Sequence, residues 1–340
     1  MVESSNTGTP GIEAQPPSDG AKETVNFAAQ IEHSIAACLV PGANPVHELG
    51  ELDRLYHEAG ATAVPFVEAT ARRLFADQHA FDNLNFQSSL LSGGSQFFGT
   101  VLRKMGELVE QDPQLAKGAA LPVKIRLVEH FRRGGNENEM GKYAGQVEAT
   151  LQTRVDAEDP LALAQLAKVR YEQSMYAFGQ KDYEGSMARG EESASLSERG
   201  GDIYGVFAAR GITAGLSRYT WVAERGDHPD NERLLNEGRE MLIADLAQAQ
   251  LELRRLEAGT PAHQNFTRTE MNNAAHLMHI AALQGDLEAA RNAMKVLEQN
   301  PVFQSAFDPA YPGDYEHAQE WIRPYPAIIK KLEALAGQNG

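Results

Sequence analysis

Cysteine is almost absent from this chain of 340 residues, which contains only Cys38. A single thiol cannot form an internal disulfide, so the sequence excludes a small secreted fold held together by disulfides. Cys38 lies in the apolar run Ala-Ala-Cys-Leu-Val. This setting is typical of an inert buried thiol and not of a nucleophile.

Long apolar runs are also missing. No stretch of about 18 apolar residues occurs, so we expect no membrane-spanning helix. The first residues include neither a basic start nor an apolar block, so we expect no secretory signal peptide. Together these absences predict a soluble, cytoplasmic protein.

Basic residues are outnumbered: 31 Lys and Arg stand against 47 Asp and Glu, which gives a formal net charge of −16. Nucleic acids and anionic membrane surfaces both attract Lys and Arg. We therefore expect neither of these partners. The charge favours a basic or neutral partner, although an acid-rich helical surface also occurs in proteins without such a partner.

The composition divides the chain into four regions. Residues 1–24 are rich in Ser, Gly and Pro and contain almost no large apolar side chain, which predicts a disordered tail. Residues 25–155 form a helical region, residues 156–300 show a longer and more regular helical pattern, and residues 301–340 combine aromatic residues with prolines. No segment alternates apolar and polar residues between turn signals as a strand does. The predicted fold class is all-α.

The clearest pattern lies between residues 272 and 297. Apolar residues recur there at helical spacing before and after a break at Gly285-Asp286. Glycine favours a left-handed helix end and aspartate caps the next helix, so the pattern predicts two antiparallel amphipathic helices. Similar breaks occur near Asp182 and Asp227. Such a helical pair cannot bury its apolar stripe alone, so we expect neighbouring pairs to stack on it.

These residues resemble the tetratricopeptide repeat, a helix-turn-helix unit of helical solenoids. The segments Gln180-Lys-Asp-Tyr-Glu-Gly-Ser and Gln284-Gly-Asp-Leu-Glu-Ala-Ala look like the turn motif of that family. Small residues match at positions needed for close helix contact, namely Ser174, Ser186, Ser193 and Ala290. The chain departs from the pattern at Met278, where a small residue is usual, and in the middle unit. The resemblance covers about residues 160–300. The region before it forms either degenerate units of the same kind or a separate domain.

The resemblance implies a stack of helical pairs with a concave groove that binds a peptide or protein segment. The first helix of each unit lines this groove, which points to Tyr171, Met175, Phe178, Thr213, Ser217, Thr220, Asn272, His276, His279 and Leu283. Helical geometry places residues 272, 276, 279 and 283 opposite the apolar stripe, so they are expected to face solvent or ligand. Tyr171 and Phe178 also fit a core stripe with Leu163 and Ala167, and we favour a core role for those two.

Arg210 falls within an apolar stripe of its predicted helix, which spans about residues 202–224. A guanidinium there must pair with a carboxylate or extend to water. The sequence favours an internal ion pair with a glutamate over recognition of a ligand carboxylate. The same helix contains Gly205, Gly211 and Gly215, which are unfavourable in a helix unless a neighbour packs closely or the helix bends.

His276 and His279 lie one helical turn apart and could share a metal ion, but no third ligand is evident. Groove-facing histidines that titrate near neutrality are favoured instead. The aromatic segment 301–326 is expected to pack on the last helical pair as a cap, with an aromatic surface for a partner as the alternative. A short closing helix is expected at about residues 327–335.

The predicted function is a non-catalytic scaffold or adaptor that binds a protein or peptide segment and needs no cofactor. Two alternatives stay open. One is a ligand-sensing regulatory protein, since the fold also serves peptide-responsive regulators. The other is a metal-dependent enzyme that uses His276, His279 and a carboxylate.

Overall fold

The protein is all-α. The computed structural model describes residues 29–30, 32–33, 36–37, 45–60, 64–77, 80–81, 84, 95–112, 120–258, 260–305 and 324–338. Within these residues every regular element is a helix and none is a strand. Among the helices described, none combines the length and the apolar character required to cross a bilayer. The predicted disordered tail, Cys38 and the aromatic residues between 306 and 323 lie outside the described residues.

The chain divides into two compact units, and the division falls within α5. The first unit comprises residues 1–89 and 95–101, and the second comprises residues 90–94 and 102–340. In the first unit, α2 (Pro45–Ala59) presents the buried Leu49, Leu52 and Leu55. Asp53 on the same helix accepts hydrogen bonds from Ser95 Oγ (2.8 Å) and from the backbone N–H of Phe97 (2.8 Å). It therefore caps the start of α5 (Gln96–Gln111).

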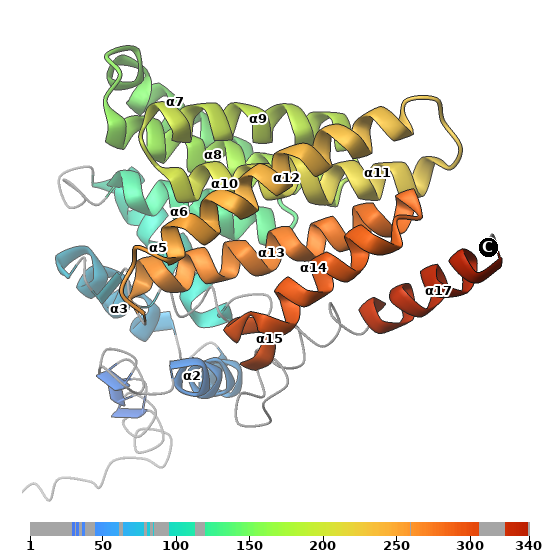
Figure 1. Cartoon of the computed structure of the whole chain (residues 1–340). Coiled ribbons are helices and arrows are strands. Elements are labelled where there is room, and N and C mark those ends of the chain that lie inside the picture. Colours follow the sequence, from blue (N-terminus) through green and yellow to red (C-terminus); the bar gives the residue numbers. More distant parts are fainter. Residues whose placement is uncertain are drawn as a thin grey trace, which may run out of the picture. The chain divides into compact units, whose positions relative to one another are not determined.

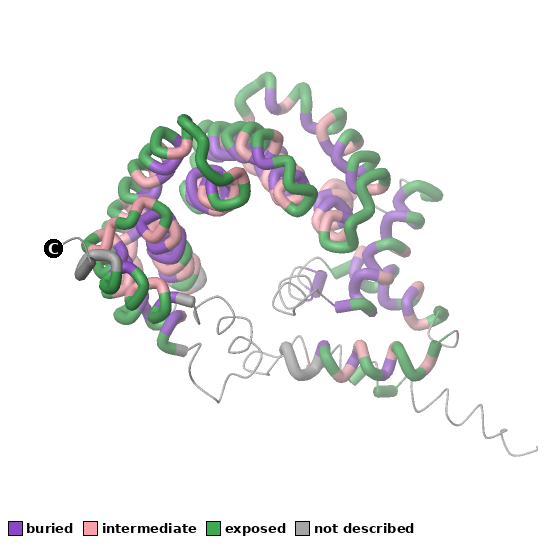
Figure 2. Tube along the Cα trace, turned by 90° about the vertical axis from the view of Figure 1, so that its right-hand side faces the viewer, coloured by how far each residue is buried: buried purple, intermediate pink, exposed green. Residues whose placement is uncertain are grey.

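The second unit is a succession of helices in which consecutive helices from α6 to α15 pack on one another, and α17 packs on α13 and α14 (Figure 1). These helices are α6 (Ala120–Arg133), α7 (Glu137–Asp156), α8 (Pro160–Gly179), α9 (Tyr183–Arg199), α10 (Ile203–Arg210), η2 (Gly211–Ser217), α11 (Arg218–Arg225), α12 (Asn231–Leu253), α13 (Pro261–Gln284), α14 (Leu287–Gln299), α15 (Pro301–Ser305) and α17 (Pro324–Gln338). Buried residues line the sides on which neighbouring helices face one another (Figure 2). The first unit contributes α2, α3 (Val64–Ala76) and the start of α5.

One turn type connects many of these helices. A residue with positive φ precedes an Asp or Asn that caps the next helix, and the N–H of that capping residue donates to the carbonyl five residues earlier. The pattern occurs at Asn136, Asp159, Asp182, Asp202 and Asp286, whose side chains each accept from a backbone N–H in the first turn of the following helix. The sequence motif around Asp182 and Asp286 thus marks a turn geometry that recurs where the motif itself is weaker.

The helix expected at residues 202–224 is present, but it is not α-helical throughout. It begins as α10, widens into the seven-residue π-helix η2 and ends as α11. Glycines lie where this helix meets α12 and α13. A Cβ atom at Gly215 would come within 2.5 Å of His276 Cγ on α13, and one at Gly238 on α12 would come within 2.3 Å of the Ala214 carbonyl oxygen. These glycines therefore allow α12 and α13 to approach the π-helical segment closely.

Small hydroxyl side chains fill the contact between α8, α9 and η2. Ser174 Oγ donates to the Ser186 carbonyl oxygen at 2.6 Å, and the hydroxyls of Ser186 and Ser217 share a hydrogen bond of 2.9 Å. Ser193 donates to the Ala167 carbonyl oxygen at 2.7 Å. All of these serines are buried, so their small size permits close helix approach while their hydroxyls stay hydrogen-bonded.

The C-terminal helices pack on α13 and α14. Phe303 on α15 and Tyr325 and Leu332 on α17 belong to one buried cluster with apolar residues of α13 and α14. The closing helix begins at Pro324 and ends at Gln338, so it is longer at both ends than the sequence predicts.

Candidate functional site

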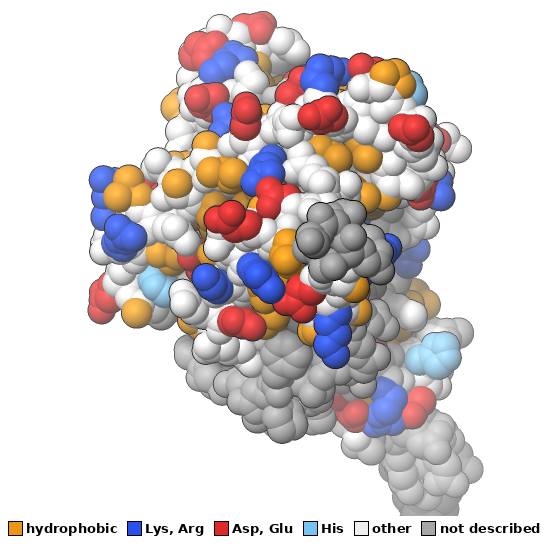
Figure 3. Space-filling view, turned by 45° about the vertical axis from the view of Figure 1, so that its right-hand side comes forward, with side chains coloured by type: hydrophobic (Ala, Val, Ile, Leu, Met, Phe, Trp, Pro, Cys, Tyr) orange, Lys and Arg blue, Asp and Glu red, His pale blue; other side chains and the backbone are white. Residues whose placement is uncertain are grey.

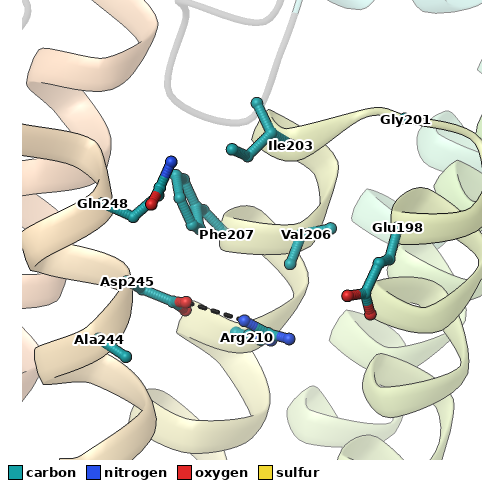
Figure 4. A pocket seen from close by; sticks show the side chains of 9 residues that line it. All are labelled: Glu198, Gly201, Ile203, Val206, Phe207, Arg210, Ala244, Asp245 and Gln248. Carbon is teal, nitrogen blue, oxygen red and sulfur yellow. Dashed lines mark hydrogen bonds and ion pairs between the residues drawn. The ribbon is translucent and has the colours of Figure 1, made fainter. Parts of the chain in front are cut away.

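A pocket of about 410 Å³ opens over α10, between the C-terminal end of α9 and the middle of α12 (Figure 4). Helix α9 ends at Arg199, and the turn at Gly201-Asp202 starts α10 at a short distance along the chain. The nine residues that line the pocket are Glu198, Gly201, Ile203, Val206, Phe207, Arg210, Ala244, Asp245 and Gln248.

The apolar part of the pocket comes from α10. Val206 and Phe207 are buried. The ring of Phe207 makes an edge contact with that of Phe266 on α13, with 6.0 Å between ring centroids. Ile203 lies at the start of α10 and is 39% exposed. The pocket therefore has a firmly packed apolar wall with one accessible apolar side chain near its edge.

The polar part of the pocket centres on an ion pair between Arg210 on α10 and Asp245 on α12. Arg210 Nη1 lies 3.0 Å from Asp245 Oδ1. The Asp245 side chain is only 3% exposed, whereas that of Arg210 is 35% exposed. Burial raises the pKa of Asp245, although the hydrogen bond and the charge of Arg210 oppose this effect. The second carboxylate oxygen, Oδ2, is buried and has no hydrogen-bond partner.

The lining carries one more negative charge than positive charge when both carboxylates are ionised. Its charged residues are Glu198, Asp245 and Arg210. Figure 4 shows Arg210 between Asp245 on α12 and Glu198 on α9. Arg210 bonds to Asp245, while Glu198 is exposed at the end of α9. The pocket is thus an apolar recess with one carboxylate that no cation of the lining offsets. Elsewhere, charges of both signs intermingle on the face shown in Figure 3.

Among the residues that the sequence singled out as possible binding residues, only Arg210 lines this pocket, and none of the predicted groove residues does. The expected internal ion pair of Arg210 is present, but the partner is an aspartate and not a glutamate. The prediction that Thr213 and Ser217 face a groove is wrong. Both are buried, because Thr213 packs towards Gly190 on α9 and Ser217 bonds to Ser186 on the same helix.

The prediction that His276 faces solvent or ligand is also wrong, since it is 5% exposed. Helix α13 packs on α12, η2 and α14, so the side opposite its apolar stripe is covered as well. Burial, with a smaller contribution from the neighbouring His279, lowers the pKa of His276 to about 3. His276 is therefore neutral at physiological pH, contrary to the expected titration near neutrality. Asn272 on the same helix is exposed.

His279 and His276 belong to a ring cluster with two tyrosines. The ring of Tyr219 stacks on that of His279 at 4.7 Å and lies 5.8 Å from that of His276. Tyr325 contacts His279 edge-on at 5.5 Å. Burial lowers the pKa of His279 and raises the pKa of Tyr219 to about 12. No group of three or more His, Cys, Asp or Glu side chains among the described residues is arranged to hold a metal ion.

Tyr171 and Met175 lie partly buried on α8, away from the pocket lining. Burial raises the pKa of Tyr171, and the adjacent negative charge of Glu172 adds to this effect. Glu172 is itself buried and pairs with Arg132 of α6 at 2.5 Å. The α6–α8 contact is thus anchored by a buried ion pair beside Tyr171.

Sequence reasoning missed Asp245 and Glu198. Asp245 had the same signal as Arg210, because it falls among Gly238, Leu242 and Ala249, which recur at helical spacing and are all buried on α12. A charged residue within an apolar stripe on each of two successive helices predicts an ion pair between them. Glu198 has no comparable signal, since it is one of many exposed glutamates.

No protein-family model matches this sequence, and comparison with curated proteins and with solved structures finds no match either.

Proposed function

We propose that this chain is a tetratricopeptide-like helical-repeat protein that binds a peptide or protein segment without catalysis and without a cofactor. The succession of helices joined by recurring capped turns supports this proposal. The buried serines at the α8–α9 contact support it as well, because close helix approach is what the small positions of such repeats provide.

The pocket over α10 is the observation that carries the proposal. Its volume of about 410 Å³ lies in the range of small ligand sites and is sufficient for one or two side chains of a partner. Firmly packed apolar walls with a few polar groups are typical of recognition pockets. We place the binding site there, and not on the α13 residues that the family resemblance favoured, because His276 is buried.

Selection from a displayed random-peptide library against the full-length protein tests this proposal. The variant Ala244→Trp places a large side chain into the pocket from an exposed position on α12. Its matched control is Ile243→Trp, because Ile243 is 49% exposed on the same helix but does not line the pocket.

We expect the selected peptides to bind the unmodified chain and Ile243→Trp equally and to lose at least about tenfold in affinity for Ala244→Trp, or 1.4 kcal/mol. Equal binding to both variants would show that the peptides bind elsewhere on the protein. A library that yields no enriched peptide would refute the peptide-binding function itself.

A further inference from the structure

We propose that the pocket over α10 receives a positively charged side chain, lysine or arginine, of the bound segment. This inference rests on the proposed peptide-binding function and adds the chemistry of the residue recognised. Charge complementarity, the unsatisfied carboxylate oxygen and the apolar walls each support it.

The first argument is the charge balance of the residues that line the pocket. Two carboxylates, Asp245 and Glu198, face one guanidinium, Arg210. One further cation would pair every charge in the pocket. A ligand carboxylate would instead introduce a third negative group beside a guanidinium that already bonds to Asp245. Recognition of a ligand carboxylate by Arg210 is therefore disfavoured by the residues around it.

The second argument is the state of Asp245. Its Oδ2 atom is buried without a hydrogen-bond partner, although the side chain lines the pocket. A buried carboxylate oxygen without a donor carries a desolvation cost that a ligand N–H group would remove. Lysine and arginine offer only donors at their charged ends, so they are matched to this atom.

The route to Oδ2 involves Arg210. Oδ2 is buried, whereas the Arg210 side chain is 35% exposed. An incoming cation would reach the carboxylate by moving the guanidinium towards Glu198, which lies on the opposite side of Arg210 (Figure 4). The final arrangement would pair the ligand with Asp245 and Arg210 with Glu198.

The third argument is the apolar wall. Lysine and arginine bury their alkyl stems along apolar surface while the charged end reaches a polar group. Ile203, Val206 and Phe207 provide such a surface along α10, with the carboxylates at its two sides. A long cationic side chain fits this combination better than a short polar one.

The test uses fluorescein-labelled heptapeptide mixtures in which only the central residue is fixed, as lysine, arginine, norleucine or glutamate. Binding to the full-length protein is measured by fluorescence anisotropy at low and at physiological salt. We expect the lysine or the arginine mixture to bind at least about tenfold more tightly than the norleucine mixture, because a charged hydrogen bond supplies that difference. The glutamate mixture should bind most weakly.

Three variants test which residues cause the preference. Glu198→Gln changes an exposed position and removes one negative charge, so the preference for the cationic mixtures over norleucine should fall severalfold. Asp245→Asn should abolish that preference while norleucine binding persists. Arg210→Gln should increase the preference for the cationic mixtures, because it removes the cation that competes with the ligand for Asp245.

The outcomes separate the two proposals. If all four mixtures bind equally and Ala244→Trp weakens all of them, peptide binding holds and the cation inference is overturned. If Arg210→Gln abolishes binding of the glutamate mixture and that mixture binds best, the pocket recognises carboxylates instead. If no mixture binds, the proposed function fails and the inference fails with it.

Discussion

The imidazole ring of His276 lies directly against the backbone of Gly215, so close that a methyl group at residue 215 would come within 2.5 Å of His276 Cγ. His276 belongs to α13 and Gly215 to the π-helix η2. The buried histidine thus packs on the π-helical part of the chain.

Replacement of Gly215 tests this contact. We expect Gly215→Ala to destabilise the protein by about 1–3 kcal/mol, the usual cost of forcing an extra carbon into a packed site. Gly211→Ala in the same π-helix is the matched control, because its Cβ would lie 3.8 Å from His276 Nε2, an ordinary contact. That variant should be neutral or slightly stabilising. Denaturant unfolding of both variants decides the matter, and equal destabilisation would contradict the proposed contact.

The buried His276 predicts a loss of stability in acid. Its pKa in the folded state is about 3, below the ordinary value of 6.5, so the unfolded chain binds the extra proton between these two values. Stability should therefore fall as the pH drops below 6.5. At pH 5 the contribution reaches at most about 2 kcal/mol, since each pH unit corresponds to about 1.4 kcal/mol.

The variant His276→Asn isolates this effect from the carboxylates that also titrate in acid. It should be less stable at pH 7, because a packed ring is lost, but its stability should decline less between pH 7 and pH 5 than that of the unmodified chain. Unfolding free energies measured at several pH values provide the comparison. Parallel curves would show that His276 is protonated as readily in the folded state as in the unfolded state.

The ion pair between Arg132 and Glu172 predicts a strongly asymmetric mutant cycle. Arg132→Met leaves a buried carboxylate without its cation, which costs about 3–5 kcal/mol in comparable sites. The double variant Arg132→Met with Glu172→Leu removes both charges and should recover most of that loss. Thermal and chemical unfolding of the single and double variants measures the recovery. A double variant as unstable as Arg132→Met would show that packing, and not charge, is what Arg132 contributes.

The recurring turn predicts the effect of losing one cap. Asp182 accepts from the backbone N–H of Gly185 at 2.9 Å at the start of α9. Asp182→Ala should cost about 1 kcal/mol, whereas Asp182→Asn keeps an acceptor oxygen and should be close to neutral. Unfolding midpoints of the two variants provide the test, and an equal effect of both would point to the charge instead of the hydrogen bond.

Local signals in the sequence were sufficient for the helical class and for many helix ends. Gly285 with Asp286 predicted the turn between α13 and α14, because capping depends on a few adjacent residues. The same kind of local signal, Asp159 followed by Pro160, stands at the start of α8.

The candidate site was harder to predict because it depends on contacts between distant segments. The spacing of Asn272 and His276 places both opposite the predicted apolar stripe of α13, but it contains no information about a second neighbour that covers His276. For Arg210, the sequence showed that the guanidinium needs a partner, but it did not show that the partner is Asp245. The only sign of the π-helix in the sequence was the presence of Gly205, Gly211 and Gly215, which are unfavourable inside a helix.

The turns at Asn136, Asp159, Asp182 and Asp202 are each specified by residues fewer than ten positions apart in the chain. Such reversals of direction can form before any remote contact exists, since loop-closure entropy is small over short distances. We therefore expect α6 to α10 to assemble progressively, each new helix docking on the one made just before it, as in chains dominated by local contacts. If the helices fold and dock one after another, the pocket over α10 is incomplete until α12 has docked, because Asp245 belongs to α12.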